Sequence, residues 1–503
     1  MKTKRGLIFF FFVFLACFLA QSLFYSCGGQ PETPQTGDVL PTAVNPEAPV
    51  EPEITDDLPP LDFKGAEFNV LTRSLKKYDV SVEGQTGEII NDAIFFRNVA
   101  VEERLNVKIN AKDIPGEWDD QNGYKSAIKK SVLSGTGAYD MISGFQVVMV
   151  STVGDGLYKD LNRIDYLNLA KPWWTRKING EMTVNNKIYL ATGDISVLMW
   201  ESIYALMFNK NMVRDYDVLN LYQLIKSGQW TLEKLIEVTK NITQDIDGNG
   251  KYDANDLYGF GTMIGNFTDN YYVAFDIPVT KWDEDGYPYL AENCDKMYRL
   301  NDIAYSFLNN NISVFSPEEK DASLVNILEP MFFSDRLMIM PTFLGDIKNM
   351  REMNTDFGII PYPKWDENQK EYFTTSHGGF NVFGIPEDAK NPAMSGAVLE
   401  ALCAESSKTV VPAFYETVLK SKFARDEESA EMLDIIRNGL SATFGYLYMV
   451  PLGAGAHNGW GPGLILRETL RPNGSDYISY YEKYESIFNA NLDQIIDAYK
   501  SLE

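Results

Sequence analysis

An acidic loop in the middle of the chain has the residue types and spacing of a calcium-binding loop. The stretch "DIDGNGKYDAND" (245–256) resembles an EF-hand loop, with Gly250 at the sixth position, where such a loop turns sharply. The expected ligands, at positions one, three, five, seven, nine and twelve, are Asp245, Asp247, Asn249, Lys251 through its carbonyl, Asp253 and Asp256. The sequence therefore predicts a structural Ca²⁺ site, with an acidic surface turn as the alternative.

This loop does not predict a calcium sensor. Sensor loops occur in pairs between amphipathic helices, whereas this chain has a single loop that ends in Asp instead of Glu. The segment that follows, "LYGFG", is typical of a strand. We therefore expect the loop to hold a connection in place.

Motifs for catalysis are scarce. The chain has two histidines, His377 and His457, and neither His nor Cys occurs at zinc-binding spacing. It contains no G-x-S-x-G elbow, no Walker loop and no G-x-G-x-x-G after a strand. A glycosidase needs only two carboxylates, and no pair stands out among 70 acidic residues. We predict no catalytic residues and no enzymatic activity, and a surface glycan-degrading enzyme is kept as an alternative.

The N-terminus has the layout of a secretory signal. Basic residues are followed by an apolar run and by the small residues around Cys27, so we predict a lipoprotein signal peptide over 1–26 and lipidation of Cys27. An uncleaved membrane anchor is the alternative. Residues 27–60 are rich in proline and acidic residues and lack aromatics, which predicts a disordered tether.

Composition limits the function of the remaining chain. A net charge of −25 argues against nucleic-acid binding, which requires a basic surface. The chain has 28 Tyr, 29 Phe and 8 Trp, enough to supply both a core and flat apolar contacts for a ligand. Cys294 and Cys403 are the only cysteines beyond Cys27, and we expect them to be buried free thiols.

Two series of alternating strands and helices predict an α/β fold. The first consists of a strand "AEFNVLTRS", a helix with Ile90, Ile94, Val101 and Leu105 on one face, a strand "NVKINAKD", a helix "YKSAIKKSVLSG" and a strand "YDMISG". This order is typical of a doubly wound parallel sheet, in which ligands bind at the carboxyl ends of the strands. The second series includes "YALMFNKNM", "TLEKLIEVTKNI", capped by Thr231, and "LYGFGTM". From Met394 on, the pattern is mainly helical.

The ordered series of segments resembles the extracellular solute-binding lipoproteins of ABC transporters, of the carbohydrate-binding type. The resemblance is carried by the signal and tether, "YDMISG" with "GLYKDLNRI", "NGEMTVNNKIYLATGD" before "YALMFNKNMV", "WTLEKLIEVTK" before the Asp-rich turn, "FFSDRLMIMPTFLGDIKNMR", and "DFGIIPYPK" before "GIPEDAKNP". It implies a two-lobed periplasmic-binding-protein-like fold (type II) whose lobes are joined by a multi-strand hinge, with crossings near 184–194 and 370–382. The N-terminal lobe would comprise 61–185 and 375–425, and the C-terminal lobe 186–374 and 426–503.

Such a protein would bind a sugar in the cleft between its lobes by aromatic stacking and by planar polar side chains. Candidate ligand-binding residues near strand ends, crossings and loops are Arg73, Asp140, Trp200, Glu201, Asp346, His377 and Trp460. Trp173 and Trp174 are further aromatic residues, expected to pack between the lobes.

The resemblance also implies partners. We expect an oligosaccharide or related solute as ligand, ABC permease subunits as partners, and a monomer outside the cytoplasm, anchored to the cell membrane through Cys27. A starch-binding outer-membrane lipoprotein of the helical-repeat class is an alternative that the β-rich stretches disfavour. A protein that reports its ligand to a kinase is another.

Overall fold

The computed structural model describes residues 55–291, 295–317, 326–419, 427–455, 459–474 and 476–502. The predicted signal peptide, Cys27 and most of the tether lie outside the described residues, as do Cys294 and His457. Cys403 is a buried free thiol, as predicted. Among the described residues, none of the helices combines the length and apolar character needed to cross a bilayer.

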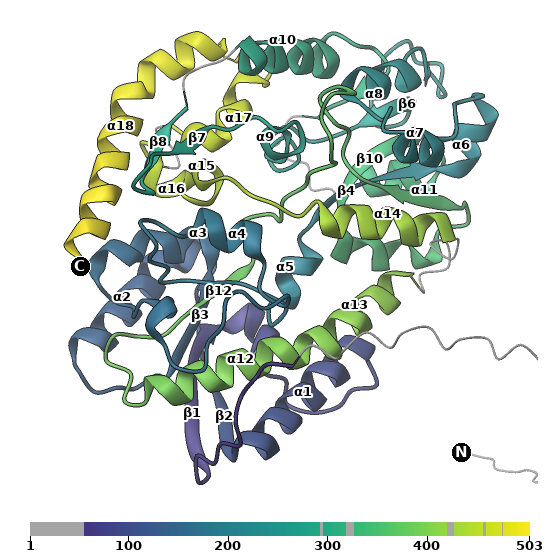
Figure 1. Cartoon of the computed structure of the whole chain (residues 1–503). Coiled ribbons are helices and arrows are strands. Elements are labelled where there is room, and N and C mark those ends of the chain that lie inside the picture. The colour runs from purple at the N-terminus through teal and green to yellow at the C-terminus, as the bar shows by residue number, and fades with distance from the viewer. Residues whose placement is uncertain are drawn as a thin grey trace, which may run out of the picture. The chain divides into compact units, whose positions relative to one another are not determined.

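The N-terminal sheet forms from the first predicted series. Strands β1 (Ala66–Arg73), β2 (Val107–Ile114) and β3 (Met141–Phe145) pair in parallel, with β1 in the centre, and β12 (Asn381–Gly384) adds an antiparallel edge beside β3. Helices α1 (Ile89–Leu105) and α2 (Gln121–Leu133) connect the parallel strands. Helices α12 (Pro392–Lys408) and α13 (Val410–Leu419) pack on α1. We call this assembly the N-terminal lobe, which lies at the bottom of Figure 1.

The C-terminal lobe is built on a mixed sheet. Its order is β11 (Phe357–Ile360), β4 (Tyr204–Asn209), β10 (Leu337–Phe343), β6 (Leu257–Gly261) and β5 (Thr243–Gln244), and β9 (Val314–Phe315) also pairs with β6. Strand β4 is antiparallel to both of its neighbours, whereas β10 and β6 are parallel. Helix α8 (Leu232–Thr239) begins at Thr231, whose side chain accepts a hydrogen bond from the Lys234 amide, as its sequence predicts. Helix α14 (Glu427–Asn438) packs on β11.

Two antiparallel segments among the described residues connect the lobes, and the chain passes between the lobes again from α13 to α14. Ala191 pairs with Phe383 at the N-terminal lobe, and Ile203 pairs with Ser376 at the C-terminal lobe. The first crossing therefore lies at 192–203 and contains α5 (Val197–Glu201), later than the predicted 184–194. The earlier residues form a turn of the N-terminal lobe, closed between Val184 and Lys187. In Figure 1, α5 lies between the two sheets.

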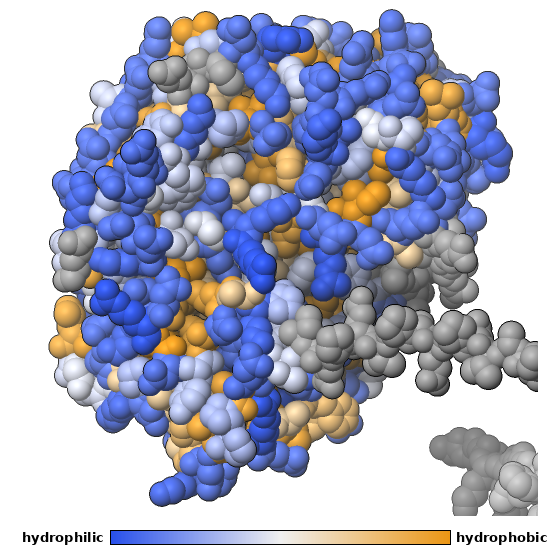
Figure 2. All heavy atoms as spheres, in the orientation of Figure 1, coloured by the Kyte–Doolittle hydropathy of each residue, from blue (hydrophilic) through white to orange (hydrophobic). Residues whose placement is uncertain are grey.

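The last part of the chain is helical, as predicted. Its elements include α15 (Phe444–Leu447), α16 (Met449–Leu452), α17 (Leu466–Thr469) and α18 (Tyr477–Ser501). Helix α16 contacts α3 (Gln146–Met149) of the N-terminal lobe, and α18 contacts α10 (Asp295–Asn309). These helices therefore touch both lobes. Hydrophilic residues cover most of the face shown in Figure 2, and apolar residues appear between them in separate patches.

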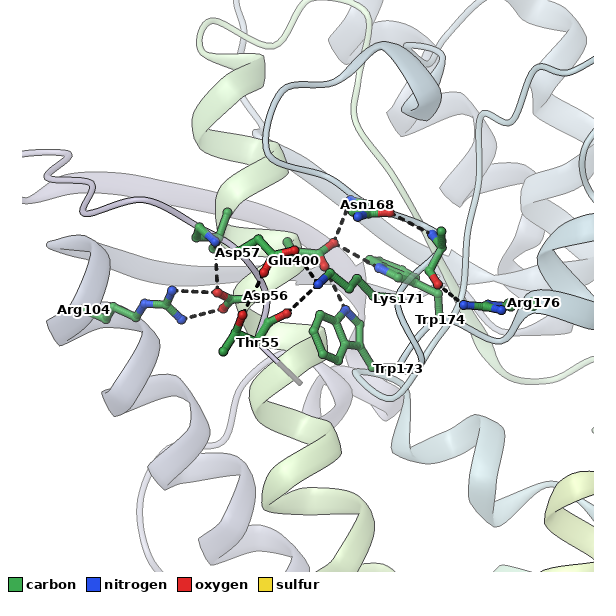
Figure 3. A network of polar contacts seen from close by, with 12 residues as sticks. Thr55, Asp56, Asp57, Arg104, Asn168, Lys171, Trp173, Trp174, Arg176 and Glu400 are labelled. Carbon is green, nitrogen blue, oxygen red and sulfur yellow. Dashed lines mark hydrogen bonds and ion pairs between the residues drawn. The ribbon is translucent and has the colours of Figure 1, made fainter. Parts of the chain in front are cut away.

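Trp173 and Trp174 belong to the interior of the N-terminal lobe, so the expectation that they pack between the lobes was wrong. Both are buried, and both indole Nε1–H groups donate to the carboxylate of Glu400 on α12, at 2.9 and 3.0 Å (Figure 3). The same carboxylate accepts the backbone N–H of Asn168 at 3.0 Å. Buried indole N–H groups require an acceptor, and Glu400 supplies it for both rings.

The end of the predicted tether is fixed to this lobe. Asp56 forms an ion pair with Arg104 of α1, and Asp57 forms one with Lys171 (Figure 3). Leu58, Leu61 and Phe63 pack against the apolar core of the lobe. The folded part therefore begins slightly before residue 61, and the limits of the two lobes stay a prediction.

Candidate functional site

Two adjoining cavities lie where residues of both lobes meet at the crossing segments. The larger, the charged hollow, has a volume of about 620 Å³, and its ionisable wall residues include Lys76, Glu88, Glu201, Asp346 and Lys348. The smaller, the aromatic hollow, has a volume of about 270 Å³, and its wall includes Trp118, Phe145, His377, Trp460 and Arg467. The rings of Phe343, in the charged hollow, and His377 have centroids 5.6 Å apart. The two hollows are therefore adjacent, with the rings of Phe343 and His377 between them.

The charged hollow brings together side chains from three parts of the fold. Lys76 and Tyr78 come from η1 (Ser74–Asp79), directly after β1, and Glu201 ends α5. Glu201 accepts a hydrogen bond from the Tyr78 hydroxyl at 2.7 Å and lies 3.8 Å from Lys348 Nζ. Asp346, from η5 (Leu344–Glu352), has no hydrogen-bond or ion-pair partner among the described residues.

The carboxylates of this hollow affect one another. Burial raises the pKa of Asp346, and the nearby Glu201 raises it further, against the effect of Lys348. Glu329, on α11 (Leu328–Phe333), is buried behind them, where burial and then Asp346 raise its pKa to about 7. Its Oε1 atom has no hydrogen-bond partner. The carboxyl oxygens of Asp346 and Glu329 can therefore accept hydrogen bonds from a ligand.

The aromatic hollow has apolar walls from both lobes. Trp118 follows β2 and Phe145 ends β3, and their ring centroids are 6.5 Å apart. The guanidinium of Arg73 lies 4.8 Å from the Phe145 centroid. On the other side, the guanidinium of Arg467 lies 4.8 Å from the Trp460 centroid. Flat apolar faces on opposite sides of a cavity can contact the C–H faces of a sugar ring.

The polar groups of the aromatic hollow carry no free charge. The Arg467 Nε–H donates to Asp269 Oδ1 at 2.8 Å, and a second guanidinium N–H donates to Oδ2 of the same carboxylate. Burial, with a smaller contribution from Arg467, lowers the pKa of His377 to about 4, so this imidazole is neutral at neutral pH. The hollow therefore suits an uncharged ligand group that can form hydrogen bonds.

Four of the seven predicted ligand-binding residues line the hollows. Glu201 and Asp346 face the charged hollow, whereas His377 and Trp460 face the aromatic hollow. Their contact with a ligand stays a prediction.

Arg73, Asp140 and Trp200 line neither hollow, so the described geometry gives no support to their predicted contact with a ligand, which stays a prediction. The Arg73 guanidinium forms its hydrogen bonds within the protein. It donates to Asn381 Oδ1 at 2.7 and 2.9 Å, to Glu117 at 2.8 Å and to the Gly379 carbonyl at 2.8 Å. Asp140 precedes β3, at the opposite end from the hollows, and accepts the Asn69 N–H at 2.9 Å.

Trp200 is a packing residue. It is buried, with its ring centroid 6.0 Å from that of Tyr415 on α13 and 5.4 Å from the guanidinium of Arg437 on α14. It thus joins α5 of the first crossing to α13 and α14.

Several lining residues were missed by sequence reasoning. Lys76, Tyr78, Trp118 and Phe145 all lie at or just after the carboxyl end of a parallel strand. The rule that ligands bind at this edge could have selected them. No sequence pattern could have selected Arg467 as a lining residue, because its position depends on how the C-terminal helices pack back against the cleft.

The Asp-rich loop connects β5 and β6, so a strand follows it, as predicted. Carboxylate oxygens of Asp245, Asp247 and Asp256 lie within 4.8 Å of one another, and Asp253 is outside this group. Asp245 accepts the N–H groups of Gly248 and Gly250 at 2.7 and 2.9 Å. Three converging carboxylates are a donor set that fits a hard cation.

Comparisons with known proteins agree with this architecture. The sequence matches no protein-family model and no curated protein. Its structure is similar to that of an ABC substrate-binding protein from Listeria monocytogenes in complex with cycloalternan, at 12% identity over 87% of this chain and 99% of that chain, with a TM-score of 0.51.

Two further solved structures are similar. The galacto-N-biose-/lacto-N-biose I-binding protein of the ABC transporter from Bifidobacterium longum, in complex with lacto-N-biose, shares 12% identity over 87% of this chain and 98% of its own, with a TM-score of 0.52. The cyclic alpha-maltosyl-1,6-maltose binding protein from Arthrobacter globiformis shares 13% identity over 87% and 99%, with a TM-score of 0.51. These similarities confirm the predicted two-lobed solute-binding fold.

Proposed function

We propose that the chain is the substrate-binding component of an ABC importer, which captures an oligosaccharide between its lobes and delivers it to permease subunits. The main support is the aromatic hollow, where Trp118 and Phe145 of one lobe and Trp460 at the other side enclose a space without free charge. The similar solved structures, which hold cycloalternan and lacto-N-biose, support the class of ligand.

Capture would proceed by lobe closure, without making or breaking a bond. Contacts to Trp118 and to Trp460 are made together only when the lobes are close, so a bound sugar favours the closed population. The two antiparallel crossings at 192–203 and 374–381 would absorb the rotation. His377, neutral and at a crossing, would offer the sugar hydroxyls a hydrogen bond.

The test is a binding measurement on the purified folded part with neutral oligosaccharides. We expect Trp460→Ala to weaken binding by about tenfold or more, because loss of one stacking face removes ~1.5 kcal/mol. The control is Trp365→Ala, a half-buried Trp that lines neither hollow. Equal affinity of Trp460→Ala and the unmutated protein, or failure of all oligosaccharides to bind, would refute the proposal.

The remaining features are part of the same proposal. A lipid at Cys27 and the tether between it and the folded part, which begins near Thr55, would hold a monomeric receptor outside the cytoplasm, close to its permease. Replacing Cys27 with Ser should release the protein from membranes. The loop at 245–256 would bind Ca²⁺ as a structural clamp between β5 and β6, supported by its three converging carboxylates.

A further inference from the structure

The charged hollow contains an acidic side chain without a partner. Of its three carboxylates, Glu201 is bound by Tyr78 and Lys348, whereas Asp346 has no hydrogen bond or ion pair among the described residues. Lys76, the other cation of the wall, lies with its Nζ 5.9 Å from the centroid of the Tyr78 ring. A half-buried carboxylate that faces a cavity without a partner can bind a donor from a ligand.

The surroundings favour a positively charged donor. Behind Asp346, the buried Glu329 has an oxygen without a hydrogen-bond partner, and because burial and Asp346 raise its pKa to about 7, a cation bound nearby would favour its ionised form. The wall carries more acidic than basic side chains, and the whole chain has a net charge of −25. Such a field attracts cations and repels anions.

The neighbouring aromatic hollow sets a different requirement. Among the described residues of its wall the one arginine, Arg467, is paired with Asp269, so an anionic sugar substituent would compete with that carboxylate. The hollows adjoin at Phe343 and His377, so one ligand of several rings that extends past this ring pair would contact both.

We propose that the charged hollow binds the protonated amine of an amino sugar at Asp346, while an uncharged ring of the same oligosaccharide lies in the aromatic hollow. The inference rests on the proposed function and specifies its ligand class. An ammonium group has three donors and no acceptor, which matches a carboxylate with free lone pairs better than a hydroxyl does.

The experiment compares two ligands that differ in one substituent, which is a protonated amine in the first and a neutral acetamido group in the second. Glucosamine oligomers and N-acetylglucosamine oligomers of equal length and linkage are titrated into the protein at about pH 6, where the free amine is protonated. We expect the amine form to bind about ten- to a hundredfold more tightly, as for a hydrogen bond between charged groups. Asp346→Asn should abolish this preference, and the control Asp493→Asn, on exposed α18, should retain it.

The outcomes separate this inference from the proposed function. If a neutral oligosaccharide binds and depends on Trp460, but the amine form binds no more tightly than its acetylated counterpart, the amine site is refuted and sugar capture stands. If Asp346→Asn keeps the preference while melting as the unmutated protein does, the amine binds elsewhere and the inference fails. If no oligosaccharide binds at all, both proposals fail.

Discussion

The ion pair between Asp269 and Arg467 supports one wall of the aromatic hollow, and its removal gives a sharp test of that wall. Both charges are withdrawn from solvent, with 1% and 15% of the respective side chains exposed. The guanidinium also lies 4.8 Å from the Trp460 centroid, so the carboxylate fixes the group on which Trp460 rests. Asp269→Asn keeps the shape of the side chain and removes its charge.

The expected cost follows from the burial of the remaining charge. A buried ion pair that loses one partner leaves the other uncompensated, which costs about 3–5 kcal/mol. The folded unit, Thr55–Glu503, has about 450 residues, and its unfolding entropy is therefore ~0.9 kcal/mol per kelvin, at ~2 cal/mol/K per residue. Asp269→Asn should thus lower Tm by about 3–5 °C, provided that the unit unfolds cooperatively.

A double-variant cycle separates the buried charge from ordinary repacking. Removing both partners, in Asp269→Asn/Arg467→Met, should cost less than Asp269→Asn alone, because no uncompensated charge is left. Thermal unfolding of the single and double variants, with and without a bound oligosaccharide, measures this. A loss below about 1 kcal/mol for Asp269→Asn, or a double variant whose loss equals the sum of the single losses, would refute the reasoning.

Three further predictions concern other parts of the molecule. Glu400→Ala should lower the free energy of unfolding by about 3–5 kcal/mol in denaturant titrations, because the buried indoles of Trp173 and Trp174 and one backbone N–H lose their acceptor. Glu400→Gln, which retains an acceptor oxygen, should lose less. The pKa of His377 is lowered from 6.5 to about 4, so its contribution to stability is complete above pH 6.5 and is lost as the pH falls to about 4. This amounts to about 3 kcal/mol, and His377→Gln should remove that slope from the pH profile of unfolding. Addition of Ca²⁺ should raise Tm and a chelator should reverse the rise, while Asp245→Asn should abolish the response and Asp493→Asn should not.

The elements of the fold were largely predictable, because local patterns determine them. The alternating apolar residues of β1 and the four-residue spacing on α2 are visible in short windows, and the structure has both. The position of the first crossing was not predictable in the same way. The residues after the turn closed between Val184 and Lys187 stay on the N-terminal lobe because Ala191 pairs with Phe383 of β12, nearly two hundred residues further on.

Site residues were predictable where the position of a residue on its strand or crossing determines which way its side chain points. Glu201 and His377 lie on the crossings and face the hollows. Arg73 also lies at the favoured end of its strand, but Asn381, Glu117 and the Gly379 carbonyl consume its donors. Sequence shows which residue types are present at a strand end, whereas the partners that neutralise them come from distant segments.

The loop after β1 shows how the hinge and the cleft are coupled. Asp79, at the end of η1, is fully buried and accepts hydrogen bonds from Ser196 Oγ at 2.7 Å and Leu198 N–H at 3.0 Å of the first crossing. It also accepts one at 2.9 Å from Asn381 Nδ2, where the second crossing enters β12. One carboxylate thus fixes η1 to both crossings.

This arrangement has a consequence for closure. Tyr78, next to Asp79, lines the charged hollow and donates to Glu201 at the end of α5. Because Asp79 and Tyr78 both bind the first crossing, the Lys76–Tyr78 side of the hollow must move with the hinge and not as a free loop of the N-terminal lobe. Contacts made by a ligand at Asp346 and Glu201 are therefore transmitted to the crossings directly, while the walls at Trp118 and Phe145 approach with the N-terminal sheet.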